Sequence, residues 1–376
     1  MPNSSSPPSG TAARYSLNAL GTPSALARLG IIGSVLLAVG IAFVWTAGWL
    51  SAGRLDQTRL IDTFEKVNGA HPGFRRNHPK GVCLVGWFDG NGAGVDLSRA
   101  TVFRSARRPV FGRFSTVGPT PETADGPDVV RSMALSFTLA DGEVWRTSMN
   151  DIPVFPVKDA QDFFDHLVAL KPDPATGKPD PARVAAFLAA HPGSARAIAL
   201  IKAAATSSGF ANATYNSLNA FRLIDADGKA TAVRWAMQPV DAFERSPIET
   251  PRGKNYLFEA LQARLQQGPV EWHLMLIVGQ PGDPTNDATM PWPADRERID
   301  AGTLTVTAIE SEAEGNCRDT EFDPLLLPSG IEPSDDPLLS ARSAAYAVSF
   351  KRRAGERKTP SAVQIGDRQI SEQGHP

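Results

Sequence analysis

The segment DDPLLSARSAAYAVSFKRR, residues 335–353, places Arg342 four residues before Tyr346. On a helix, side chains four residues apart lie on the same face. A cation in that position favours the charged form of a tyrosine, which otherwise loses its proton near pH ~10. A phenolate binds ferric iron well, and tyrosine is one of the few protein ligands that haem iron accepts. The pattern also arises by chance, so its meaning depends on the segments that precede it.

The amino terminus contains a long uncharged segment. Residues 1–28 are rich in Ser, Pro, Gly and Ala and carry Arg14 and Arg28 without any acidic residue, and residues 29–50, LGIIGSVLLAVGIAFVWTAGWL, carry no charge. Such a stretch can cross the ~30 Å hydrocarbon layer as a helix and is longer than the roughly 7–15 apolar residues of a cleavable signal. We expect a cytoplasmic tail at 1–28 and an uncleaved single-pass anchor at 29–50 in the inner membrane. The remainder would then lie in the periplasm or outside, because basic residues stay on the cytoplasmic side. A cleaved signal is the alternative.

The rest of the chain has the composition of one globular domain. The chain has 376 residues with a formal net charge of −2 and 42% hydrophobic residues, and its basic cluster at 351–353 is too short to indicate nucleic-acid binding. We expect a domain at 55–355 followed by a loose polar tail at 356–376. Export would permit a disulfide between Cys83 and Cys317. Because Cys83 lies in an apolar run, however, we favour simple burial over a bond.

The hydrophobic pattern predicts many antiparallel strands and a helical insertion. Asp141-Gly142 and Asp227-Gly228 each separate two apolar runs, which is typical of tight hairpins. Strands are expected at 81–88, 109–117, 133–139, 144–149, 221–224, 232–237, 274–278 and 302–306. Helices are expected at 57–67, 159–170, 181–190, 194–205 and 255–267. This order indicates an α+β fold around a closed barrel, with a late helix that carries Tyr346.

Three segments upstream of the late helix carry side chains suited to peroxide chemistry. FRRNHPKG (74–81) contains His78, which could accept a proton from one peroxide oxygen and deliver it to the other. RFSTV (113–117) offers a serine that could orient an imidazole and an arginine that could pair with a carboxylate. SMNDIPVF (148–155) contains Asn150, an amide that could hydrogen-bond peroxide without competing for protons. Taken alone, His78 would more often be a loop histidine without a role.

In this order, the segments resemble those of the catalase superfamily over residues 58–353. The matching patterns are Arg-x-x-His-x-Lys-Gly, Arg-Phe-Ser-Thr-Val, Asn-x-x-Pro-x-Phe and Ile-Glu-Pro-Ser (331–334) leading into Arg-x-x-x-Tyr. The resemblance implies a catalase-like antiparallel β-barrel that binds haem b. It further implies a distal catalytic set and a proximal iron ligand. The implied catalytic residues are His78, Asn150 and Ser115, the last as the hydrogen-bond partner of the histidine; the implied metal ligand is Tyr346; and the implied cofactor-binding residues are Arg75, Arg113, Val117, Phe155, Arg342 and Arg353.

Several departures point to a particular branch of this superfamily. Pro79 replaces the alanine that usually follows the histidine, Ala347 replaces a proline that often follows the tyrosine, and little sequence follows Phe350. The chain therefore resembles the catalase-related peroxidases. We expect it to reduce H₂O₂ or organic hydroperoxides with an organic electron donor, with weak catalase activity. The alternatives are rearrangement of fatty-acid hydroperoxides by haem and a barrel that binds haem without catalysis. The sequence does not indicate the oligomeric state.

Overall fold

The computed structural model describes residues 23–46, 55–246, 253–315 and 317–366. Two compact units are present, Met1–Arg54 and Leu55–Pro376. In the first unit, helix α1 spans Pro23–Thr46, and its segment Leu26–Thr46 is long and apolar enough to cross a membrane, with a mean hydropathy of 2.2. The helix therefore begins before the expected anchor at 29–50, and the last part of that prediction, residues 47–50, lies outside the described residues.

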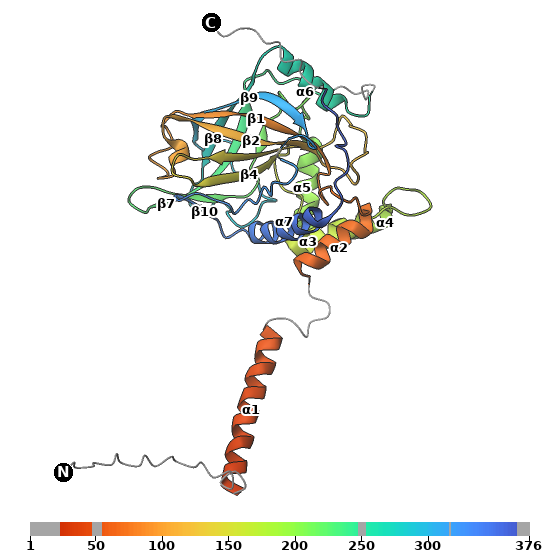
Figure 1. The fold of residues 1–376 in the computed structure, drawn as a ribbon, viewed down its shortest axis with the longest axis vertical. Helices are drawn as coiled ribbons and strands as arrows, with labels where there is room; N and C mark the ends of the chain where they lie inside the picture. Colours follow the sequence, from red (N-terminus) through yellow and green to blue (C-terminus); the bar gives the residue numbers. More distant parts are fainter. Residues whose placement is uncertain (1–22, 47–54, 247–252, 316, 367–376) are drawn as a thin grey trace, which may run out of the picture. The chain divides into compact units, whose positions relative to one another are not determined.

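The second unit is built around a closed antiparallel barrel of eight strands (Figure 1). The barrel closes in the order β7-β5-β4-β3-β2-β1-β9-β8, with β8 pairing back to β7, and β6 and β10 extend the sheet beside β7. The α+β prediction and the closed barrel are thus confirmed. The strands are β1 (Lys80–Gly90), β2 (Ala106–Thr116), β3 (Arg131–Thr138), β4 (Val144–Asn150), β5 (Tyr215–Asn216), β6 (Phe221–Ile224), β7 (Ala230–Pro239), β8 (Val270–Val278), β9 (Arg298–Ser311) and β10 (Ile331–Pro333).

Aromatic side chains fill the core. Trp145 stacks on Phe137 with ring centroids 4.7 Å apart, and Trp235 lies edge-on to Trp145 at 5.2 Å. Two buried indoles donate their N–H groups within the core. Trp235 donates to the Thr147 hydroxyl at 3.0 Å, and Trp272 donates to the Ala213 carbonyl at 3.2 Å. Both tryptophans are therefore buried core residues with satisfied polar groups.

Most helices gather on one side of the barrel, whereas α6 lies apart from them beside β9 (Figure 1). The helices are α2 (Gln57–Asn68), α3 (Ala160–Ala169), α4 (Pro181–Ala190), α5 (Pro192–Ala203), α6 (Tyr256–Gln266) and α7 (Pro337–Gly355), with a short 3₁₀ turn at Thr101–Phe103. A small apolar cluster joins α2 to α7 and α3, with Leu60, Ile61 and Phe64 packed on Ala345 and Phe163. Asp336 caps the start of α7 by accepting a bond from the Leu338 amide at 2.9 Å, and Pro337 occupies the first turn. These contacts fix the helix that carries Arg342 and Tyr346.

Two expectations about the domain are wrong. Cys83 on β1 and Cys317, in the segment after β9, form a disulfide, whereas burial alone was expected. The reason is that β1 pairs with β9 and so brings the end of β9 beside Cys83. The described part of the tail is also not loose: Val363 is buried, and the Ser361 hydroxyl accepts a bond from the Ala313 amide at 2.6 Å.

Candidate active site

One cavity receives nearly all of the predicted site residues. It has about 1170 Å³ of empty volume, part of which opens to solvent, and lies between α2, α3, α7, strands β2–β4 and the segments 75–78 and 320–322. Its wall includes Arg75, His78, Arg113, Ser115, Asn150, Phe155, Arg342, Tyr346 and Arg353. Val117 is the exception: it follows the end of β2, is 37% exposed and is not part of this wall.

His78 lies in a strained backbone conformation at the start of β1. Its φ is +53°, a region that residues with a side chain rarely adopt, and the Asn77 side chain accepts a bond from its backbone amide at 3.0 Å. The restricted ring of Pro79 follows immediately. Strain of this kind costs roughly 1–3 kcal/mol and persists only where the surroundings hold it. Here it turns the imidazole into the cavity.

The hydrogen-bond partner of His78 is a different serine from the expected one. Ser132 Oγ lies 3.0 Å from His78 Nδ1 and also donates to Asn150 Oδ1. Register explains the difference, because Ser115 pairs with Ser132 across β2 and β3, and Ser132 pairs with Asn150 across β3 and β4. The three side chains form a row on one face of the barrel. Ser132 lies between Asn150 and Ser115. It is therefore Ser132, and not Ser115 as predicted, that hydrogen-bonds His78.

This arrangement selects one tautomer of His78. A serine hydroxyl has a single proton, and that of Ser132 is directed to Asn150. Nδ1 of His78 must therefore be the donor to Ser132 Oγ, which leaves the lone pair on Nε2 free. Burial, followed by the charges of Arg113, Arg342 and Arg75, lowers the pKa of His78 to about 3. The imidazole is thus neutral at ordinary pH and can accept a proton at Nε2.

Arg342 and Tyr346 meet as the sequence predicts. Arg342 Nη2 donates to Tyr346 Oη at 3.4 Å, and the guanidinium also donates to Asn219 Oδ1. Asn219 in turn donates to Asp336 at 2.8 Å. Sequence reasoning missed Asn219, because nothing in its local sequence links it to a helix more than a hundred residues later. The chain from Asp336 through Asn219 and Arg342 holds the phenol oxygen of Tyr346 from one side.

A cluster of buried arginines forms another part of the wall. Arg113 Nε donates to Glu312 Oε1 at 2.6 Å, and Arg75 Nη1 donates to the same oxygen at 3.2 Å. Arg353 Nε donates to the Arg318 carbonyl at 3.1 Å. Burial and the charges of Arg113 and Arg353 lower the pKa of Arg75 well below its usual value, and burial lowers that of Arg353 to about 10. Sequence reasoning missed Glu312 because the expected strand at 302–306 ended well before it, whereas β9 runs to Ser311 and places Glu312 directly after it.

The residues fit a planar, apolar group that carries carboxylates. Arg75, Arg113 and Arg353 supply three guanidiniums around one shared carboxylate, an excess of buried positive charge that an anionic ligand would relieve. Leu60, Ile61, Phe64, Phe155 and Phe163 supply an apolar wall. Within the described ranges, no group of three His, Cys, Asp or Glu residues could hold a metal ion. Tyr346, which also lines the cavity, is a suitable ligand for a metal that a cofactor carries.

Comparison with known proteins decides the family. The family model described as Catalase matches residues 45–364. The chain belongs to the catalase family. It is 34% identical to the catalase-related peroxidase of Synechococcus elongatus over 86% of this chain and 94% of that protein, and 35% identical to the catalase-related peroxidase of Mycolicibacterium paratuberculosis over 81% and 96%. The predicted resemblance, and with it an oxidoreductase related to these peroxidases, is confirmed.

Solved catalases share the fold of this family member. A fungal catalase matches with a TM-score of 0.69 at 19% identity over 83% of this chain and 67% of that chain. Catalase A from Saccharomyces cerevisiae matches with a TM-score of 0.68 at 20% identity over 80% of this chain and 65% of that chain. The barrel and its helices therefore correspond to the catalase architecture, and the family is haem-dependent.

Proposed function

We propose that this chain is a haem b peroxidase that reduces H₂O₂ or organic hydroperoxides with electrons from an organic donor. The observation that carries the proposal is that His78, Ser132 and Asn150 share one cavity with the Arg342–Tyr346 pair and the arginine cluster. The names of the two relatives at 34% and 35% identity support the same reaction class. Haem, when bound, supplies the redox chemistry that cleaves the peroxide O–O bond.

The proposed roles of the residues follow from their chemistry. Tyr346 would ligate the iron through its phenol oxygen, to which the Arg342 guanidinium donates a hydrogen bond. Arg75, Arg113 and Arg353 would hold the two carboxylates of the porphyrin through charge-assisted hydrogen bonds. Phe155 would pack against the apolar part of the ring.

Proton transfer would be the task of His78. Its free Nε2 can accept a proton from one peroxide oxygen and return it to the other, so that the second oxygen leaves as water or as an alcohol. Ser132 holds the imidazole in the tautomer that this requires. Asn150 presents an amide that orients the peroxide without taking its proton. The organic donor then returns two electrons.

Steady-state turnover of the full-length chain in detergent tests this proposal. The chain is supplied with haem and H₂O₂, and oxidation of a phenolic donor is measured beside O₂ release. Donor oxidation that exceeds O₂ release supports a peroxidase. Dominant O₂ release without donor oxidation would make catalase the better description, and a chain that takes up no haem would refute both.

A second candidate function has one observation in its favour. Haem would cover part of the apolar cavity wall formed by Leu60, Ile61, Phe64 and Phe163, and the uncovered part would suit a hydrocarbon chain. Such a wall would accept a fatty-acid hydroperoxide, which haem could rearrange without an external reductant. Incubation with a lipid hydroperoxide, with and without the phenolic donor, separates the two reactions, because rearrangement consumes the hydroperoxide equally in both. A non-catalytic haem carrier would consume none.

We also propose that the chain is a single-pass protein of the inner membrane with its enzyme domain on the periplasmic or outer side. The long apolar helix α1 and the disulfide between Cys83 and Cys317 support this placement, since disulfides persist in oxidising compartments. Protease treatment of intact spheroplasts provides the test. Digestion of the enzyme domain is expected, and its full protection would refute the orientation. The mass of the membrane-bound chain then shows whether the amino terminus is retained.

A further inference from the structure

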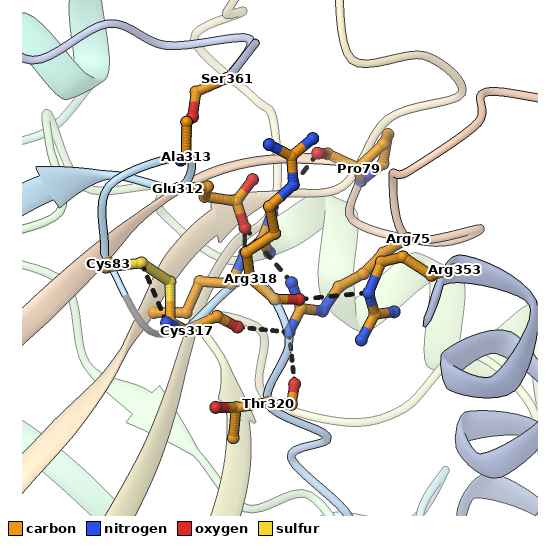
Figure 2. The surroundings of a disulfide bond; sticks show 11 residues. Arg75, Pro79, Cys83, Glu312, Ala313, Cys317, Arg318, Thr320, Arg353 and Ser361 are labelled. Carbon is orange, nitrogen blue, oxygen red and sulfur yellow. Dashed lines mark hydrogen bonds and ion pairs between the residues drawn. A yellow bond between two sulfur atoms is a disulfide. The ribbon is translucent and has the colours of Figure 1, made fainter. Parts of the chain in front are cut away.

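The disulfide lies beside the arginine cluster, and Figure 2 shows it next to the loop that contacts Arg75 and Arg353. Cys317 begins a loop, residues 317–320, whose backbone carbonyls point toward the guanidiniums. Arg75 Nη2 donates to the Cys317 carbonyl at 3.0 Å and to the Thr320 carbonyl at 2.7 Å, while Arg353 Nε donates to the Arg318 carbonyl at 3.1 Å. Backbone carbonyls of this loop, and not its side chains, therefore hold Arg75 and Arg353 in place.

The third arginine is tied to the other end of the disulfide. Cys83 on β1 pairs in register with Arg113 on β2. The single bond between Cys83 and Cys317 thus joins the strand partner of Arg113 to the residue whose carbonyl holds Arg75. The Cys317 amide also lies 3.3 Å from Cys83 Sγ. Among the described residues, the Cys83–Cys317 bond is the only disulfide, so apart from the chain itself it is the one covalent tie between the 317–320 loop and the barrel.

Holding the cluster together requires such a link. Arg75, Arg113 and Arg353 repel one another, and Arg75 and Arg113 share the single carboxylate of Glu312. Backbone carbonyls offset this repulsion only while they stay in place. The chain just before the loop packs closely on the disulfide, because a Cβ at Gly315 would lie 2.6 Å from Cys83 Sγ, closer than real Cβ contacts.

We propose that the Cys83–Cys317 disulfide is a positioning element for the arginines that bind the haem carboxylates, and that its reduction releases haem more readily. This inference rests on the proposed haem function. The chemical step is a thiol–disulfide exchange: a dithiol reductant gives two electrons and two protons to the S–S bond, leaves Cys83 and Cys317 as thiols, and is itself oxidised to a disulfide. Reoxidation restores the bond and the cluster.

Haem loss from the full-length holoprotein tests the inference. The oxidised chain, the chain reduced with dithiothreitol and the double variant Cys83→Ala/Cys317→Ala are each mixed with excess apomyoglobin, and transfer of haem is followed by absorption. Loss of the carbonyl bonds to Arg75 and Arg353 should raise the rate of transfer about tenfold, the effect of one hydrogen bond to a charged group. The reduced wild type serves if the double variant does not fold.

Two controls separate positioning from general stability. Leu261→Ala removes a buried side chain on α6 that does not line the cavity, so it lowers stability without touching the cluster. Haem dimethyl ester lacks the free carboxylates, so its loss should be insensitive to reduction. The inference is overturned if reduction leaves the rate of haem transfer unchanged or if Leu261→Ala raises that rate equally. It is also overturned if reduction accelerates release of the ester as much as release of haem. A chain that never binds haem refutes the proposed function instead.

Discussion

Arg342 Nη2 lies 3.4 Å from Tyr346 Oη, one turn further along α7. The same guanidinium is held from behind by Asn219, which is bonded to the helix cap Asp336. The Arg342 guanidinium is thus held by two contacts. One is to the phenol oxygen of Tyr346, and the other leads through Asn219 to the start of its own helix. This fixed geometry distinguishes the pair from an arginine and a tyrosine that share a helix face by chance.

Replacing Arg342 should weaken the iron site more than it weakens the fold. In Arg342→Leu, the hydrogen bond to the Tyr346 oxygen is lost together with the positive charge beside that oxygen. We expect peroxide turnover to fall about 10–100-fold, as for loss of one hydrogen bond to a charged group, with a changed visible spectrum. Arg342→Lys keeps the charge and should be intermediate. A spectrum and turnover of the leucine variant equal to wild type would contradict the proximal role.

Ser132 and Ser115 form a matched pair for testing the distal site. Ser132 contacts His78 Nδ1, whereas Ser115 is its register partner on β2. Ser132→Ala removes the partner that sets the tautomer of the imidazole, so turnover with H₂O₂ should fall about tenfold or more at unchanged haem content. Ser115→Ala should change it less. Equal losses in the two variants, measured under the same conditions, would show that the register does not select the serine.

The lowered pKa of His78 has consequences for pH dependence. With a folded-state pKa of about 3, His78 should be neutral above pH 5, so the rate of peroxide reduction should show no step near pH 6.5. The unfolded chain takes up a proton near pH ~6.5, so stability falls as the pH falls between these values, by up to about 2 kcal/mol from pH 7 to pH 5. Urea unfolding of haem-free wild type and His78→Gln measures this difference. Identical pH slopes in the two chains would contradict the buried neutral imidazole.

The variant His78→Ala tests the proton-transfer role of the imidazole directly. Peroxide turnover should be lost while haem remains bound, because the imidazole carries protons and does not ligate the iron. Haem content is read from the visible spectrum of the same sample. Unchanged turnover in this variant would refute the proton-transfer role.

Glu312→Gln should destabilise the haem-free chain strongly. The substitution leaves Arg75 and Arg113 buried without their shared carboxylate, and breaking a buried pair typically costs about 3–5 kcal/mol. The neighbouring arginines lower the pKa of Glu312, so its contribution is present above the unfolded-state pKa and is lost as the pH falls through the folded-state value. Haem should recover part of the loss through its carboxylates. Melting temperatures with and without haem provide the measurement, and an equal loss in both would argue against haem carboxylates at this cluster.

Much of the site was predictable because its information is local. The spacing of Arg342 and Tyr346 places them on one helix face whatever surrounds the helix. The Asp-Gly dipeptides at 141–142 and 227–228 predict hairpins, and β3–β4 and β6–β7 form there. His78, Asn150 and the arginines were found through the order of motifs, and all of them line the cavity.

The remaining features depend on contacts between distant segments. Sequence alone indicated the α+β class, the barrel and the late helix, since periodicity and turns are properties of neighbouring residues, and the order of the motifs indicated the family. Only the tertiary structure decided that Ser132 and not Ser115 contacts His78, that Asn219 and Glu312 complete the site, and that Cys83 bonds to Cys317. These pairings follow from strand register and from chain closure across the barrel. Neither leaves a periodic signal in the sequence, because each depends on which residues the fold brings face to face.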